Sequence, residues 1–148
     1  MSTFTQIYYH IVFGTFRRQP VMIKSGRDAL YRCIWGIIKN HHCHLYRING
    51  VEDHFHIFTS LHPTVCLADL VKDVKLGSES WLKTNPVFPH FDRWQEGYGA
   101  FTISHQEKDA LIEYIKNQEE HHQKYTWLEE YKRFLQETGV HYDEKYLT

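Results

Sequence analysis

The order of strand-like and helix-like segments constrains the fold of this chain more than any other feature of its sequence. Apolar residues recur at helical spacing in two segments, at 24–41 and from 63 to about 83. Four further segments are rich in β-branched and aromatic residues, which is typical of strands: 5–16, 42–48, 53–60 and 98–104. The resulting order, strand-helix-strand-strand-helix-strand, predicts an α+β, ferredoxin-like (RRM-like) fold with an antiparallel sheet.

The connections between these segments carry local signals. Asn49-Gly50 supplies turn chemistry between the second and third strand segments and predicts an antiparallel hairpin. Ser104, followed three residues later by Glu107, forms a capping box that predicts the start of a helix. Another helix is expected at 126–137. The ferredoxin-like core is therefore expected to be followed by C-terminal helices.

Composition limits the classes of protein to which the chain can belong. Its 148 residues, 42% of them hydrophobic, suit a single domain, 1–148, with a sizeable core. No apolar run approaches the roughly 20 residues of a membrane span. Met1 to Gln19 lacks the layout of a signal peptide, so we expect a cytoplasmic protein. With 17 Lys and Arg against 18 Asp and Glu, any nucleic-acid site must be local.

Two histidines, in the run His54-Phe55-His56, lie within a predicted strand. Because alternate strand residues point to the same face, both imidazoles are expected to project together. Two nitrogens directed at one point suit a divalent metal ion. The chain has 12 histidines, so the motif alone leaves open the alternative that one or both are polar surface residues.

A tyrosine and a glutamine follow in the helix after Ser104, which is expected to continue to His121 or His122. Tyr114 and Gln118 are four residues apart, which places both side chains on one helical face. A tyrosine hydroxyl, with a pKa of about 10, is a poor nucleophile unless a metal or a base assists it. Packing in the core is the alternative role for Tyr114, and spacing alone does not decide between the two.

Taken together, these two features resemble the HUH endonuclease superfamily, in particular the single-tyrosine transposases of small bacterial insertion sequences, which are related to the REP-associated tyrosine transposases. The resemblance extends over nearly the whole chain. Its further elements are His10-Ile11-Val12-Phe13, Arg17-Arg18, Asp69-Leu70-Val71-Lys72, Ser80-Trp81, Gly97-Tyr98-Gly99-Ala100-Phe101, Gln118-Glu119-Glu120-His121-His122 and the segment from Tyr142 to Leu147.

The resemblance implies a function and a set of roles. His54, His56 and Gln118 are expected to bind Mg²⁺ or Mn²⁺, because nitrogen and oxygen ligands together suit such an ion better than a closed zinc site. Tyr114 is expected to attack single-stranded DNA, leaving a 5′-phosphotyrosine and a free 3′-hydroxyl. The expected substrates are hairpins at the ends of the mobile element. The expected assembly is a homodimer, with active sites that can be completed in trans by the tyrosine helix.

Other residues have weaker claims to a role. Asp53 can orient a ligating histidine, and His121 can be an alternate ligand, although a turn residue and a cation near a helix end are ordinary alternatives. Candidate DNA contacts are cations and one aromatic residue, and a solvated charged face is the alternative for the lysines. These candidates are Arg17, Arg18, Lys72, Lys75, Trp81 and Lys83.

Three competing interpretations follow from the same features. The chain can be a domesticated relative that binds hairpin DNA, or a replication-initiation nuclease of the same superfamily. The presence of all four expected catalytic residues argues for activity, and the short chain without a helicase domain argues against replication initiation. A ferredoxin-like RNA-binding module, in which sheet aromatics stack on bases, is the alternative from another class.

Overall fold

A computed structural model describes residues 2–147, which form one antiparallel sheet between two layers of helices. The strand order is β2-β3-β1-β4, and together with the chain order this confirms the ferredoxin-like α+β fold. Short 3₁₀ turns lie at Phe16–Arg18, His105–Glu107 and Glu144–Tyr146. The elements are β1 (Tyr8–Gly14), α1 (Lys24–Asn40), β2 (Leu45–Gly50), β3 (His54–Ser60), α2 (Leu67–Thr84), β4 (Gly99–Thr102), α3 (Lys108–Lys116), α4 (Gln118–His121) and α5 (Trp127–Glu137).

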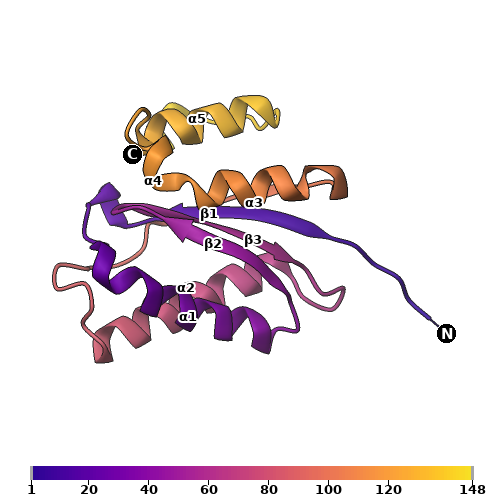
Figure 1. The fold of residues 1–148 in the computed structure, drawn as a ribbon, viewed down its shortest axis with the longest axis horizontal. Helices are drawn as coiled ribbons and strands as arrows, with labels where there is room; N and C mark the ends of the chain where they lie inside the picture. The colour runs from indigo at the N-terminus through magenta and orange to yellow at the C-terminus, as the bar shows by residue number, and fades with distance from the viewer. Residues whose placement is uncertain (1, 148) are drawn as a thin grey trace.

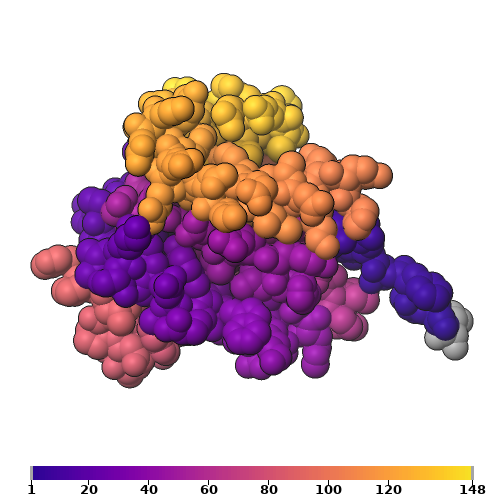
Figure 2. Space-filling view, in the orientation of Figure 1, coloured from indigo at the N-terminus to yellow at the C-terminus, as the bar shows by residue number. Residues whose placement is uncertain are grey.

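Different helices cover the two faces of the sheet. Figure 1 shows α1 and α2 packed on one face and α3 to α5 on the other. In Figure 2 the C-terminal segment, orange to yellow, forms a layer above the indigo to magenta part of the chain. Among the described residues, no helix combines the length and apolar character needed to cross a membrane.

The face toward α1 and α2 holds the largest apolar cluster. Phe13, Phe55 and Trp94 meet there edge to face, with ring centroids 4.7 to 5.5 Å apart. Aliphatic side chains from the two helices fill the rest of this layer, among them Leu30, Ile34, Ile38, Leu70 and Val74. The opposite face has two smaller clusters, one around Phe58 and Ile115 and one around Phe101 and Trp127.

The hairpin turn differs from its prediction. Asn49 and Gly50 lie inside β2, and residues 51–53 make the connection to β3. A Cβ at Gly50 would collide with the backbone of β3, so glycine is needed here for the close approach of two strands. The Asn49 amide instead donates to the carbonyl oxygens of Ile115 and Lys116, both at 3.1 Å, and so holds the end of α3 on the sheet.

The second helix begins at Leu67, later than predicted. His62 holds the preceding residues in a turn, because its Nδ1 accepts a hydrogen bond from the backbone N–H of Thr64 at 3.2 Å. The helix predicted to run on to His121 or His122 is interrupted at Asn117, which separates α3 from α4. The predicted capping box is present: the Glu107 carboxylate accepts from the backbone N–H of Ser104.

Candidate metal and nucleophile site

Both histidines of β3 point to the face covered by α3 and α5. Strand alternation sends Phe55 into the apolar cluster on the other face, and the central place of β3 in the sheet buries His54 and His56 completely. The imidazole of His54 stacks on the indole of Trp127, with ring centroids 4.2 Å apart. The imidazole of His56 meets the ring of Tyr114 edge to face at 5.7 Å.

Neighbouring polar groups fix the orientation of each imidazole. Nδ1 of His54 lies 2.7 Å from a carboxylate oxygen of Asp53. Nδ1 of His56 lies 2.8 Å from Nε2 of His10, whose own Nδ1 is buried without a hydrogen-bond partner. The Nε2 atoms of both β3 histidines therefore face the same point above the sheet, which is the arrangement that metal-binding histidines adopt.

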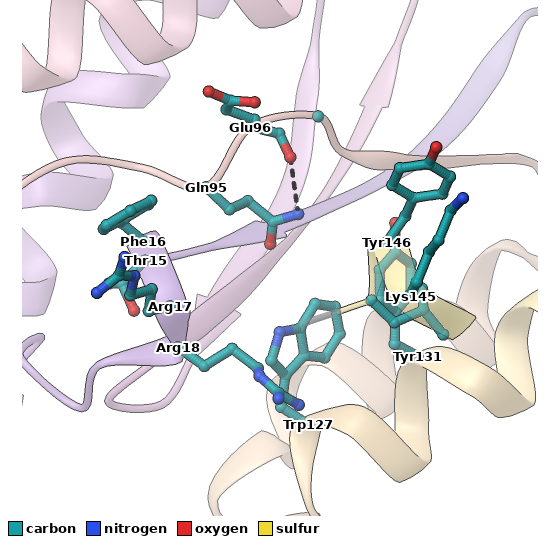
Figure 3. A pocket seen from close by; sticks show the side chains of 12 residues that line it. Thr15, Phe16, Arg17, Arg18, Gln95, Glu96, Trp127, Tyr131, Lys145 and Tyr146 are labelled. Carbon is teal, nitrogen blue, oxygen red and sulfur yellow. Dashed lines mark hydrogen bonds between the residues drawn. The ribbon is translucent and has the colours of Figure 1, made fainter. Parts of the chain in front are cut away.

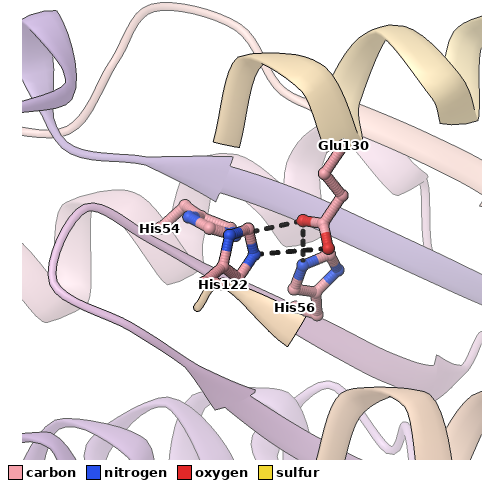
Figure 4. Close-up of side chains that lie close together, drawn as sticks. All are labelled: His54, His56, His122 and Glu130. Atoms are coloured by element: carbon pink, nitrogen blue, oxygen red, sulfur yellow. Dashed lines mark hydrogen bonds and ion pairs between the residues drawn. The ribbon is translucent and has the colours of Figure 1, made fainter. Parts of the chain in front are cut away.

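The carboxylate of Glu130 occupies this point (Figure 4). Glu130 Oε1 lies 3.1 Å from Nε2 of His54 and 2.8 Å from Nε2 of His56. Its other oxygen, Oε2, lies 2.9 Å from Nε2 of His121 and 3.3 Å from Nε2 of His122. Only 2% of Glu130 is exposed, so one buried carboxylate from α5 connects four imidazoles, of which those of His121 and His122 are partly exposed.

The hydroxyl of Tyr114 joins the same cluster. It donates a hydrogen bond to Oε2 of Glu130, and it lies 3.3 Å from Nε2 of His121. Tyr114 is on α3, which Asn49 anchors to β2 near its end. The tyrosine thus reaches the histidine pair of its own chain.

Gln118 also reaches the cluster, but its amide nitrogen faces Glu130. Nε2 of Gln118 lies 3.4 Å from Glu130 Oε2, and Oε1 lies 3.1 Å from Nε2 of His122. The side chain is fully buried. Rotation of the amide by half a turn would exchange the two atoms, so the carbonyl oxygen is within reach of the same centre.

The electrostatics of the cluster favour a cation. Burial would raise the pKa of the Glu130 carboxyl, but the attraction of His56 and hydrogen bonds from the surrounding imidazoles outweigh it and hold that pKa well below its usual range. Burial, followed by the negative charge of Glu130, raises the pKa of the Tyr114 hydroxyl. The cluster therefore contains a carboxylate and a neutral tyrosine, and a positive charge placed there would ease loss of the tyrosine proton.

The two β3 histidines respond differently to burial. Burial lowers the pKa of His56 more strongly than Glu130 raises it, which favours the neutral form of the imidazole that binds metals. Burial acts in the same direction on His54, but hydrogen bonds with Asp53 and Glu130 outweigh it and raise the pKa of that imidazole.

A pocket of about 420 Å³ is lined by Trp127 but not by Glu130, Tyr114 or the histidines of the cluster (Figure 3). Tyr114 and His121 line a separate hollow of about 630 Å³. Arg17, Arg18 and Lys145 bring positive charge to its lining. The aromatic residues Trp127, Tyr131 and Tyr146 line it as well, and the indole of Trp127 is the one that stacks on His54. The pocket thus combines groups that bind phosphate with groups that stack on bases.

The other predicted DNA contacts lie on α2, on the opposite face of the sheet. Lys72 and Lys83 are exposed there, and Trp81 packs against the apolar cluster. Lys75 is half-buried and donates to the carbonyl oxygens of Gln95 and Gly97, at 2.8 and 2.5 Å. The structure therefore does not bring these four residues together with Arg17 and Arg18, although Lys75 supports the loop that lines the pocket.

Sequence reasoning did not identify Glu130, and it did not select His122 as a ligand. The signal for Glu130 was present in α5, whose inward face follows helical spacing through Trp127, Glu130, Tyr131, Phe134 and Leu135. A carboxylate in the middle of such an apolar face needs a partner, and that pattern marks a functional position. Asp53 lies where a residue that orients His54 would lie, and His121 lies beside both Glu130 and Tyr114.

Comparisons with known proteins find similarity to transposases. The model of the family described as "Transposase IS200 like" matches residues 3–118. A candidate transposase from Deinococcus radiodurans R1 is similar in structure, with a TM-score of 0.62 and 23% identity over 80% of this chain and 95% of that one. A REP-associated tyrosine transposase bound to a REP hairpin is also similar, with a TM-score of 0.60 and 13% identity over 82% of this chain and 74% of that one. No curated protein matches the chain.

Proposed function

The chain belongs to the IS200-like transposase family, and we propose that it cleaves and rejoins single-stranded DNA through a covalent bond to Tyr114. One observation carries the proposal. The Tyr114 hydroxyl shares a single buried carboxylate with the imidazoles of His54 and His56. A tyrosine that served packing alone would not need its hydroxyl at the meeting point of a histidine pair.

His54, His56 and Gln118 are the residues that we propose hold Mg²⁺ or Mn²⁺. The cluster fits such an ion because its Nε2 atoms converge and its carboxylate lacks a Lys or Arg partner among residues 2–147. When bound, the ion polarises the scissile phosphate and offsets negative charge that develops on it. Asp53 serves this site by fixing the ring of His54.

The proposed reaction is an in-line transfer of the phosphoryl group. The oxygen of Tyr114 bonds to phosphorus as the bond from phosphorus to the DNA 3′-oxygen breaks. The tyrosine proton is lost to the hydrogen-bonded groups around the hydroxyl, Glu130 Oε2 and Nε2 of His121, and the 3′-oxygen takes up a proton from water. The products are a 5′-phosphotyrosine and a free 3′-hydroxyl. Because the new ester conserves the energy of the old one, another 3′-hydroxyl can reverse the step and join strands without ATP.

The DNA is proposed to approach through the pocket beside Trp127. Arg17, Arg18 and Lys145 would neutralise phosphates, and Tyr146, which is 77% exposed, would stack on a base. We propose hairpin DNA as the substrate, since the similar REP-associated transposase is bound to a REP hairpin. The protein is proposed to act in the cytoplasm. A homodimer stays a prediction from the sequence resemblance.

The helices that cover both faces of the sheet argue against an RNA-binding module. In a module of that class the aromatic residues of the sheet are open to bases. Here Tyr8 and Phe58 are buried beneath α3, and β3 is covered on both faces. An RNA strand could reach these aromatic rings only if α3 moved away.

Incubation of the purified protein with labelled single-stranded hairpin DNA from its own genomic flanks, with Mg²⁺ or Mn²⁺, tests the proposal. A denaturing gel should reveal a covalent adduct that needs the metal and is absent with Tyr114→Phe. Tyr9→Phe is the matched control, because Tyr9 lies on the opposite face of the sheet, and it should keep the adduct. An adduct that survives in Tyr114→Phe would refute the nucleophile. If the wild-type protein binds the DNA but forms no adduct, the chain is a hairpin-binding relative.

A further inference from the structure

The Glu130 carboxylate is held in an unusual way for a buried acid. Among the described residues its ion-pair partners are His54, His56, His121 and His122, and no lysine or arginine reaches it. An imidazole, unlike an ammonium or a guanidinium group, does not carry a permanent charge. A buried carboxylate without a permanent countercharge is costly unless a cation accompanies it.

The hydrogen-bond partners of two of these histidines indicate where their ring protons lie. Nδ1 of His54 faces the carboxylate of Asp53, and Nδ1 of His122 faces the backbone carbonyl of Tyr125 at 2.8 Å. Both partners only accept hydrogen bonds, so each Nδ1 carries the ring proton, and in a neutral ring Nε2 is then a lone pair. Nε2 of His54 and Nε2 of His122 both face the Glu130 carboxylate, and Nε2 of His122 also lies 3.1 Å from Oε1 of Gln118. Oxygen acceptors thus surround these nitrogens, an arrangement that a shared cation resolves.

The distances between the Glu130 carboxylate and the imidazole nitrogens fit the distances between ligands of one metal ion. Ligands that lie about 2.1 Å from a six-coordinate divalent ion are roughly 3 Å from their nearest neighbours. Glu130 Oε1 lies 3.1 Å from Nε2 of His54 and 2.8 Å from Nε2 of His56. The oxygen is thus already at ligand separation from each of the two nitrogens.

We infer that Glu130 is itself a metal ligand, donated by α5 to the site of His54 and His56. The inference rests on the proposed function and adds an anionic ligand that lies beyond residues 3–118, the part of the chain matched by the family model. It also assigns α5 a role, because Oε2 of the same carboxylate holds the Tyr114 hydroxyl. One residue then connects the metal to the nucleophile and fixes their relative position.

Binding of Mn²⁺ to the purified full chain tests this inference without DNA. Free Mn²⁺ is counted by electron paramagnetic resonance during a titration. Glu130→Gln should raise the dissociation constant by about tenfold or more, since even the loss of a group that only orients a ligand costs 10- to 100-fold. Glu129→Gln removes the same charge from an exposed position of the same helix and should bind as the wild type does.

Thermal melting separates a ligand from a merely structural residue. Mn²⁺ should raise the melting temperature of the wild type and of Glu129→Gln, and should raise that of Glu130→Gln much less. If Glu130 only braces the fold, Glu130→Gln lowers the melting temperature in EDTA and keeps the full rise with Mn²⁺. That result would overturn the inference. So would tighter binding by Glu130→Gln, which would make the carboxylate a competitor of the metal.

Two further variants keep the test decisive. Glu130→Asp keeps the charge but shortens the reach, so it should bind Mn²⁺ with intermediate strength, and it replaces Glu130→Gln if that variant does not fold. A double variant, His54→Ala with His56→Ala, should bind no Mn²⁺. If the double variant loses binding while Glu130→Gln keeps wild-type affinity, the inference fails and the proposed metal site stands. If the wild type itself binds no Mn²⁺, both fail.

Discussion

The two faces of the sheet are built from the same strands but have opposite characters. Toward α1 and α2, Phe13 and Phe55 interlock with Trp94 and with aliphatic side chains of both helices. Toward α3 and α5, the alternate residues His54 and His56 meet a carboxylate and a tyrosine. The difference teaches that strand alternation lets one strand supply stability on one side and chemistry on the other.

The face of the sheet that carries the histidines depends on the apolar face for its stability. Buried imidazoles and a buried carboxylate add little net stability, because the cost of removing them from water offsets their mutual attraction. The three aromatic rings on the other face hold β3 in place through apolar burial and close packing. The histidine pair can therefore be arranged for binding without having to stabilise the fold.

Substitutions at two residues of β3, one on each face of the sheet, test this division between stability and chemistry and have the largest expected effect. Phe55→Ala should lower the free energy of unfolding by about 3–5 kcal/mol, because it empties the centre of the apolar cluster. His56→Ala should abolish binding of Mn²⁺ and should cost less stability than Phe55→Ala, because three other imidazoles, those of His54, His121 and His122, still contact Glu130. Urea denaturation followed by circular dichroism, with a Mn²⁺ titration of each folded variant, measures both. An equal loss of stability in the two variants would show that the histidine side is part of the core.

Ser78 provides a smaller test, within the apolar face. Its hydroxyl accepts a hydrogen bond from Nε1 of Trp94 at 2.9 Å and donates to the carbonyl of Val74 at 2.6 Å. Ser78→Ala leaves the buried indole N–H without a partner and should cost about 1–3 kcal/mol. Thermal and urea unfolding measure the loss, and Ser80→Ala, at an exposed position of α2, should cost little.

A double variant decides what the Ser78→Ala result means. If the cost comes from the unpaired indole, Ser78→Ala combined with Trp94→Phe should cost less than the sum of the two single changes. Simple additivity would assign the loss to packing instead. Ser78 and Trp94 satisfy each other's hydrogen bonds, whereas we propose that the Glu130 cluster is completed by a cation.

The sequence predicted the fold because the signals for its elements are local. Strand and helix periodicity determine the element order, and the capping box at Ser104 lies within four residues. The hairpin turn was misplaced because the reason for Gly50 is the close approach of β3, which local patterns do not contain. The interruption at Asn117 was missed for a similar reason, since the spacing of Tyr114 and Gln118 suits an unbroken helix equally well.

The candidate site was predictable only in part. Both histidines belong to one strand, so alternation alone brings their side chains together. Glu130 joins them from 74 or more positions along the chain, through the docking of α5, and spacing in the sequence does not encode that docking. The lysines of α2 were grouped with Arg17 and Arg18 by charge, but charge does not tell which face of the sheet a helix covers.

The smallest expected effect concerns the start of α3, on the face that carries the site. The Glu107 carboxylate accepts hydrogen bonds from the hydroxyl and the backbone N–H of Ser104, and these lower its pKa from the usual 4.5. A carboxyl group whose pKa is lowered by folding stabilises the folded state above its unfolded pKa, and this contribution is lost as pH falls through the folded value. The box should therefore weaken below about pH 4.5.

Glu107→Gln should thus lower the melting temperature at pH 6 by less than Ser78→Ala does, and the difference from the wild type should shrink as the pH falls below 4.5. Differential scanning calorimetry at several pH values measures this difference. Glu113→Gln removes the same charge from an exposed position of α3 and serves as the control. If the gap stayed constant down to pH 3, the carboxylate would not be acting as a cap. The position of α3, and with it Tyr114, would then depend on Asn49 and on packing against Phe58.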